Sequence, residues 1–206
     1  MSVAPKYAAH ALSPHPAIHT IEFYVDYTCP FSGIFFNRLT TSVLPLLQTK
    51  YANKAQLIFR HNIQPWHPSS VLTHEAALAV ERVSPDKFWE FSKVLFERQD
   101  EFYDLKVVDE TRNQTYARLA KIAESVGVDG EKVLALLKIE GKGGEKGKEL
   151  NIGNQITTDL KLLVRAARTV GAHVTPSVFF NGVYQPNIES SWSEEQWDEW
   201  LAEKLV

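Results

Sequence analysis

The chain has 206 residues, of which 44% are hydrophobic and 23% charged, and its formal net charge at pH 7 is −3. This length fits one large domain or one domain that carries an insertion. The even spread of charge argues against a nucleic-acid-binding protein, because contacts to phosphates need concentrated positive charge. No apolar run reaches the ~18 residues of a membrane span, and the N-terminus lacks the pattern of a signal or transit peptide, so we expect a cytoplasmic location.

The N-terminal third of the chain predicts a leader followed by a β–α–β unit. Residues 1–17 contain three prolines and no periodicity, which is typical of a flexible leader. β-branched and aromatic residues predict strands at 18–27 and 56–60. Apolar residues at three- and four-residue spacing predict a helix between them, kinked at Pro45. A helical connection of this length implies that the two strands are parallel.

The middle of the chain, residues 63–149, has a helical pattern that is too long for a loop and predicts an inserted α-helical subdomain. Thr111 and Gln114 form the pattern of a capping box, and Asp129 is a second candidate N-cap. The segment 141–148, GKGGEKGK, breaks the pattern and predicts a flexible joint.

The C-terminal part of the chain is predicted to complete the α/β unit that begins in the N-terminal third. It contains a predicted helix to about residue 170 and a strand at 174–183, with Asn181 and Gly182 as a hairpin turn. Ser193 and Gln196 have the spacing of a capping box for a last helix with a tryptophan stripe. The sequence therefore predicts an α/β unit made of residues 18–62 and 150–206, interrupted by the helical insertion.

The chemically informative segment is DYTCPFS, residues 26–32, between the first strand and the first helix. This position places Cys29 at a helix N-terminus, where free N–H groups and the helix dipole stabilise an anion and thus the nucleophilic thiolate. Pro30 suits the first helical position because it needs no hydrogen-bond partner there. Cys29 is the single cysteine, so no intrachain disulfide can form, and a multi-cysteine zinc site is excluded.

Two segments resemble a known family. IEFYVDYTCPFS (21–32) and GAHVTPSVFFNG (171–182) are similar to the DsbA-like thiol oxidoreductases, which have a thioredoxin fold with a helical subdomain inserted into it. The resemblance implies that Cys29 is the nucleophile. It also implies that Thr175 and Pro176 are the cis-proline pair opposite the sulfur, and that the Thr175 backbone can pair with a bound peptide.

The sequence departs from that family at Ser32, which stands where the family has a second, resolving cysteine. An intramolecular dithiol cycle is therefore unavailable. What the resemblance then implies is a monothiol thiol-disulfide oxidoreductase: Cys29 attacks a disulfide or a glutathionylated substrate, and an external thiol such as glutathione completes the turnover. In this interpretation Ser32 donates a hydrogen bond to the thiolate, and no cofactor is tightly bound.

A second resemblance is to kappa-class glutathione transferases and 2-hydroxychromene-2-carboxylate isomerases, which carry a related motif at the same junction with an aspartate at the offset of Asp26. Glutathione transferase or isomerase activity is therefore an alternative function. A third alternative is a member that binds thiols or peptides without turnover. The three functions predict different outcomes. The oxidoreductase reduces disulfides with glutathione, the transferase or isomerase conjugates glutathione or isomerises a substrate, and the third kind of protein only binds.

Several residues near the motif are candidates for substrate binding or proton transfer. Pro30 and Phe31 follow the cysteine, and Trp66 and His67 lie on a loop predicted to leave a strand end on the same side as Cys29. Trp66 is either a wall for a ligand or an anchor for the insertion. Asp26 is either a proton acceptor or a residue that holds the turn. The histidines do not have metal-ligand spacing, and no metal is predicted.

Overall fold

The computed structural model describes residues 3–12, 17–139, 151 and 153–205 of the chain. The predicted joint at 141–148 lies outside the described residues. Within them, a five-stranded sheet has the order β1-β3-β2-β4-β5. Its strands are β1 (Ala11–Leu12), β2 (His19–Val25), β3 (Ala55–His61), β4 (Ser177–Phe180) and β5 (Val183–Tyr184). β2 and β3 run parallel, as the sequence predicted, and the other pairs are antiparallel.

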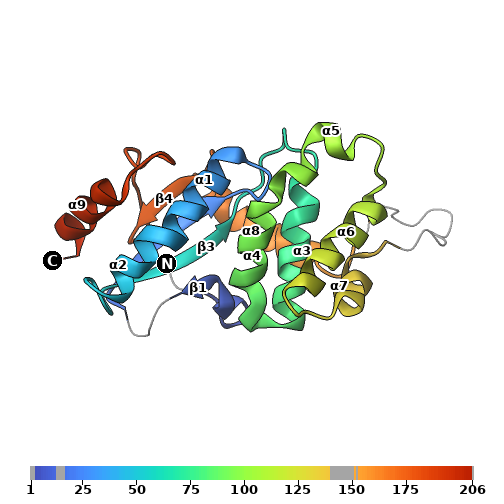
Figure 1. Ribbon diagram of the computed structural model, residues 1–206, viewed down its shortest axis with the longest axis horizontal. Coiled ribbons are helices and arrows are strands. Elements are labelled where there is room, and N and C mark those ends of the chain that lie inside the picture. The colour runs from blue at the N-terminus through green and yellow to red at the C-terminus, as the bar shows by residue number, and fades with distance from the viewer. Residues whose placement is uncertain (1–2, 13–16, 140–150, 152, 206) are drawn as a thin grey trace.

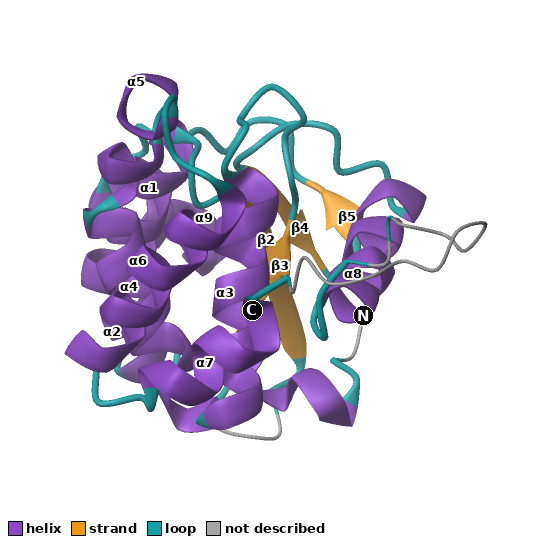
Figure 2. Ribbon diagram, turned by 90° about the vertical axis from the view of Figure 1, so that its right-hand side faces the viewer, coloured by secondary structure: helices purple, strands orange, loops and turns teal. Residues whose placement is uncertain are grey.

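The centre of the sheet is buried on both faces, which agrees with the β-branched and aromatic residues that predominate in its central strands. Ile21, Phe23 and Val25 of β2 face the main core. Tyr24, between them, packs with Phe179 on the opposite face against the end of α8 (Thr157–Thr169). Figure 2 shows this arrangement, with α8 on one side of the sheet and most other helices on the other. The predicted α/β architecture is therefore confirmed.

The helix after β2 is continuous through Pro45 but changes its winding. Helix α1 (Pro30–Arg38) passes into a π-helical turn, η2 (Leu39–Val43), and then into α2 (Leu44–Gln48). Proline lacks an N–H and its ring clashes with a carbonyl one turn earlier, and the π turn lies where that clash would occur. The sequence predicted a kink at Pro45, and the structure has a π-helical turn just before it instead.

The helices between β3 and α8 form a separate group beside the sheet (Figure 1). They are α3 (Ser70–Val83), α4 (Phe88–Glu97), α5 (Asp104–Val107), α6 (Arg112–Ser125) and α7 (Gly130–Leu137), with 3-10 turns η3 (Pro85–Lys87) and η4 (Gln99–Phe102). The capping box of Thr111 and Gln114 and the Asp129 N-cap are both present. Among the described residues, no helix is long and apolar enough to cross a bilayer.

The last helix and the hairpin turn lie where local signals place them, but β4 is shorter than the strand predicted at 174–183. It begins at Ser177, because the chain bends at 174–176 and proline cannot donate to a sheet. Ser193 and Gln196 form the capping box of α9 (Glu194–Lys204), and Trp197 of this helix is fully buried. Asn181 and Gly182 have φ values of 50° and 80°, which is the geometry of the predicted hairpin turn between β4 and β5.

The prediction of a flexible leader at 1–17 was wrong for residues 5–12. Residues Pro5–His10 form a 3-10 helix, η1, and β1 pairs with the edge of β3. The Trp89 indole N–H donates to Ala9 O at 2.7 Å, and His10 is buried beside Glu81, with 3.1 Å between Nε2 and Oε2. These contacts join distant parts of the chain, so the local periodicity of the segment carries no sign of them.

Candidate active site

Cys29 is the N-cap of α1 and follows β2 by one short turn. Its N–H donates to Asp26 O at 3.1 Å, and its own carbonyl accepts from Gly33 N–H at 3.1 Å, so the backbone of the turn is fixed at both ends. The residue is only 5% exposed. The sulfur therefore lies at the end of a helix where unpaired N–H groups favour a negative charge.

The segment that faces the sulfur comes from the far end of the chain. Cys29 Sγ donates to Thr175 O at 3.4 Å, and the Thr175–Pro176 peptide bond is cis. The fold thus brings together two motifs that are 146 residues apart. The Thr175 side-chain oxygen is buried and has no hydrogen-bond partner within the described chain.

Ser32 is fully buried one turn into α1. Its Oγ accepts a hydrogen bond from Asp26 N–H at 3.2 Å. Within the described residues, the group hydrogen-bonded to Sγ is the Thr175 carbonyl, and no hydrogen bond joins Ser32 to Cys29. The structure therefore places Ser32 beneath the turn, where its oxygen ties the end of β2 to the first turn of α1.

Asp26 is fully buried and accepts several hydrogen bonds. One carboxylate oxygen accepts from Thr28 N–H and Thr28 Oγ1–H, at 2.9 Å each, and the other accepts from Gln64 N–H at 2.9 Å. The second oxygen also lies 3.0 Å from His67 Nδ1, and His74 Nε2 lies 3.7 Å from the first. This bonding is that of a residue that holds the turn and the neighbouring loop.

The ionisation of Asp26 follows from the same contacts. Burial by itself raises the pKa of the carboxyl, but the hydrogen bonds and charge of His74, with those of His67 and Thr28 N–H, outweigh it and hold the pKa well below its usual range. Asp26 is therefore a carboxylate, and a hydrogen-bond acceptor, at neutral pH.

A buried group of histidines continues from Asp26 into the core. His74 Nδ1 and His61 Nδ1 are 2.6 Å apart, and the His61 ring lies 4.9 Å from that of His10, centroid to centroid. Burial, and then the charges of His74 and His10, lower the pKa of His61 well below its usual value. His61 and His74 are among the histidines that the sequence offers as acid–base candidates, whereas His10 was not identified, because its spacing matches no local motif.

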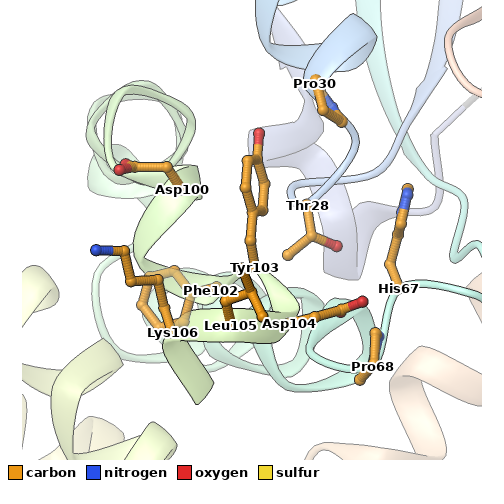
Figure 3. A pocket seen from close by; sticks show the side chains of 10 residues that line it. All are labelled: Thr28, Pro30, His67, Pro68, Asp100, Phe102, Tyr103, Asp104, Leu105 and Lys106. Atoms are coloured by element: carbon orange, nitrogen blue, oxygen red, sulfur yellow. The ribbon is translucent and has the colours of Figure 1, made fainter. Parts of the chain in front are cut away.

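A cavity of about 380 Å³ opens beside the cysteine. Figure 3 shows the residues of the Cys29 turn and the β3–α3 loop on one side and the η4–α5 segment of the insertion on the other. In Figure 1 the same segment and the start of α1 lie at one edge of the molecule. The lining residues are Thr28, Pro30, His67, Pro68, Asp100, Phe102, Tyr103, Asp104, Leu105 and Lys106.

The other predicted binding residues lie on the surface near this cavity. Phe31 and Trp66 are 61% and 63% exposed and are not part of the cavity lining. The indole of Trp66 stands edge-on to the His67 ring, with centroids 6.0 Å apart. A side chain this exposed does not anchor the insertion to the core, which was one of the two interpretations of Trp66.

The insertion contributes two residues that the sequence did not reveal. Oriented with its nitrogen toward the turn, the Gln99 amide donates to the carbonyls of Tyr27 and Cys29 at 3.1 Å each. Tyr103 lines the cavity, and its pKa is raised by burial and by the negative charges of Asp100 and Cys29. Their position 70 or more residues after Cys29 gives no local signal of either contact.

No group of histidine, cysteine or acidic residues in the described ranges has the arrangement of a metal site. The site is therefore built from a thiol, a backbone carbonyl, a buried carboxylate and an imidazole. This set can perform nucleophilic attack by sulfur and proton transfer.

Comparisons with known proteins agree with the fold. A family model described as thioredoxin matches residues 11–203. Among solved structures, a candidate protein-disulfide isomerase from Pseudomonas syringae has a TM-score of 0.73 at 20% identity, covering 96% of this chain and 98% of that one. BdbD from Bacillus subtilis has a TM-score of 0.63 at 19% identity, covering 95% and 92%.

Oxidised DsbA of Mycobacterium tuberculosis has a TM-score of 0.62 at 19% identity and also covers 95% and 92%. No match was found among curated protein sequences. These likenesses confirm the predicted thioredoxin fold with its helical insertion.

Proposed function

The chain belongs to the thioredoxin family, and from that premise we propose that it is a thiol-disulfide oxidoreductase that works with one cysteine. The observation that carries the proposal is the position of Cys29 Sγ at the N-terminus of α1, 3.4 Å from Thr175 O beside the cis peptide bond. The helix end stabilises the thiolate, and the 175–176 segment offers backbone groups next to it for a bound disulfide.

The single cysteine determines the kind of cycle. The Cys29 thiolate attacks one sulfur of a disulfide R–S–S–R′, the bond between those sulfurs breaks, and R′ leaves as a thiolate that takes up a proton. The product is a mixed disulfide between Cys29 and R. Because Ser32 cannot expel R, a second, external thiol R″SH must lose its proton and attack the R sulfur, which regenerates the Cys29 thiolate and releases R–S–S–R″.

We propose glutathione as the external thiol, in a cytoplasmic setting, and glutathionylated or disulfide-containing proteins or small molecules as substrates. The cavity of about 380 Å³ next to Thr28 and Pro30 supports the use of a compact thiol. Pro30, Phe31, Trp66 and the Thr175–Pro176 pair would contact the substrate. Ser32, held beneath the turn by Asp26 N–H, would support the Cys29 backbone and the helix end.

The test is mass spectrometry of the full chain after incubation with oxidised glutathione, followed by reduced glutathione. We expect fast addition of one glutathione to Cys29 and its release by reduced glutathione. The Cys29→Ala variant should show neither step, and Ser32→Ala should retain both. Absence of the adduct, with a Cys29 that is also slow toward iodoacetamide, would refute the proposal.

The same protein samples distinguish the alternatives. Conjugation of glutathione to an electrophile, or isomerisation of a chromene carboxylate, without an adduct on Cys29 would indicate a transferase or isomerase. Binding of glutathione without either reaction would indicate a member that only binds thiols.

A further inference from the structure

His67 is held in one orientation by the loop between β3 and α3. The backbone N–H of His67 donates to Gln64 O at 3.1 Å, and its backbone carbonyl accepts from Ser70 N–H at 3.0 Å. Gln64 N–H in turn donates to the same Asp26 oxygen, Oδ2, that lies 3.0 Å from His67 Nδ1. The loop and the ring are therefore fixed to one buried carboxylate.

The charge of Asp26 determines which ring nitrogen of His67 carries a proton. Asp26 remains ionised at neutral pH and can only accept a hydrogen bond, so the neutral ring donates from Nδ1. Nε2 then has a free lone pair. A carboxylate that orients an imidazole in this way is the arrangement of an acid–base pair in which Nε2 exchanges the proton.

The same carboxylate connects His67 to the cysteine turn. Asp26 Oδ1 accepts from the N–H and hydroxyl of Thr28, the residue before Cys29. His67 lines the cavity together with Thr28 and Pro30, which flank Cys29 on both sides, and its side chain is 21% exposed. Figure 3 shows these three residues on one side of the cavity.

Several charged or titratable groups border the cavity around His67. Asp26, with His74 behind it, lies on the sheet side. Asp100, Tyr103, Asp104 and Lys106 lie on the insertion side.

We propose that His67 is the acid–base residue of the thiol-disulfide exchange, with Asp26 as its positioning residue. In the first step, protonated His67 gives the Nε2 proton to the departing R′ thiolate as Cys29 attacks the disulfide. In the second, neutral His67 takes the proton of R″SH, and the resulting thiolate attacks the R sulfur of the mixed disulfide. The sum is R–S–S–R′ + R″SH → R–S–S–R″ + R′SH, with no other oxidant or reductant.

This role rests on the proposed monothiol cycle and explains how that cycle proceeds at neutral pH. A thiol with a pKa of about 8.5 is only a few per cent ionised at pH 7. A positioned base removes this limitation, and such bases commonly accelerate proton transfers by about 10²–10⁴-fold. A dithiol enzyme can recruit a second cysteine of its own, whereas this chain depends on a thiol from solution.

The experiment measures the second step in isolation with the full-length protein. Wild type, His67→Asn and His67→Gln are first converted to the Cys29–glutathione mixed disulfide with oxidised glutathione. Release is then timed at pH 7 with two monothiols, one with a pKa of about 8.5 and one acidic enough to be already ionised. The asparagine amide can still donate to Asp26, so this variant retains the bond that holds the loop. His173→Asn, an exposed histidine outside the cavity, is the matched control.

We expect both His67 variants to lose about 100-fold in release by the weakly acidic thiol and no more than about threefold with the ionised thiol. Their release rate with the weakly acidic thiol should rise with pH until that thiol itself ionises. Alkylation of reduced Cys29 by iodoacetamide should stay within about threefold of wild type, since it needs no proton transfer from a thiol. His173→Asn should match wild type throughout.

Equal losses with both thiols would show that His67 only holds the loop or the ligand, and unchanged rates would show that it has no role; either result overturns the inference. A wild-type protein that forms no mixed disulfide would instead refute the proposed function, and this inference with it. The two failures are distinguishable, because only the second appears without any substitution.

Discussion

The two sides of the Cys29 cavity are built in opposite ways. On the sheet side, Asp26 and Ser32 are fully buried and joined to the backbone of the turn by hydrogen bonds. On the insertion side, Leu105 is 91% exposed and Asp104 and Lys106 are on the surface. The first side resembles a protein core, and the second resembles a binding surface without its partner.

This difference separates two tasks. A reacting sulfur needs neighbours that do not move, which buried and fully bonded groups provide. Recognition of varied disulfides needs accessible apolar and charged groups, which the short η4–α5 segment provides. We therefore expect substitutions on the sheet side to change folding stability, and substitutions on the insertion side to change substrate use.

The largest effect should come from Asp26→Ala. The substitution leaves Thr28 N–H, Gln64 N–H and the histidines without their buried acceptor, and breaking such a network costs about 3–5 kcal/mol. Urea unfolding at pH 7 measures the change in the free energy of unfolding. Asp104→Ala, on the exposed side, should change it by no more than about 0.5 kcal/mol. Similar losses for the two variants would contradict the distinction between the sides.

Acid should destabilise the sheet side through His61. The pKa of this buried group is lowered in the folded protein, so below its ordinary value of 6.5 the unfolded chain binds a proton that the folded one does not. Stability is then lost as the pH falls below about 6.5, by up to about 1.4 kcal/mol per pH unit. Unfolding curves from pH 7.5 to 5 measure this slope.

His61→Phe should flatten the slope, even though His74 loses a partner and the variant is less stable at pH 7. His173→Gln, at an exposed position, should leave the slope as in wild type. An unchanged slope in His61→Phe would assign the acid sensitivity to other groups.

The insertion side is tested by Leu105→Asp. Because Leu105 is 91% exposed, we expect the free energy of unfolding to stay within about 0.5 kcal/mol. Catalytic efficiency toward a disulfide with apolar substituents should fall about tenfold, as for the loss of an apolar contact in a binding site. The control is Leu162→Asp, a 50%-exposed leucine of α8 outside this cavity. If the control lowers efficiency equally, Leu105 is not part of a substrate surface.

The smallest effect concerns Gln99, whose amide joins the insertion to the turn that carries Cys29. Gln99→Ala removes the bonds to the Tyr27 and Cys29 carbonyls and should cost about 1 kcal/mol. Gly33→Ala should displace the same amide, since its Cβ would lie 2.1 Å from the terminal atom of the Gln99 amide that points away from the turn. The double variant should therefore lose less stability than the sum of the two single variants. Additive losses in urea unfolding would show that this amide does not couple the sites.

The sequence by itself determined the features that depend on neighbouring residues. Cys29 at a strand-to-helix junction, the capping boxes at Thr111 and Ser193, and the turn at Asn181 and Gly182 all follow from spacing of four residues or fewer. The α/β thioredoxin fold came from a longer resemblance that carried the order of strands and helices. Local hydrogen bonds and hydrophobic periodicity are encoded in short windows of sequence.

Only the tertiary structure decided which groups surround the sulfur. The bond from Cys29 to Thr175 spans 146 residues, and that from His67 to Asp26 spans 41. The roles of Gln99 and Tyr103, and the packing of residues 5–12, arise in the same way. A contact of this kind depends on how whole helices and strands pack against each other. The free energy of that packing is spread over the buried core, so the sequence near the contacting residues shows no periodic pattern that would predict the contact.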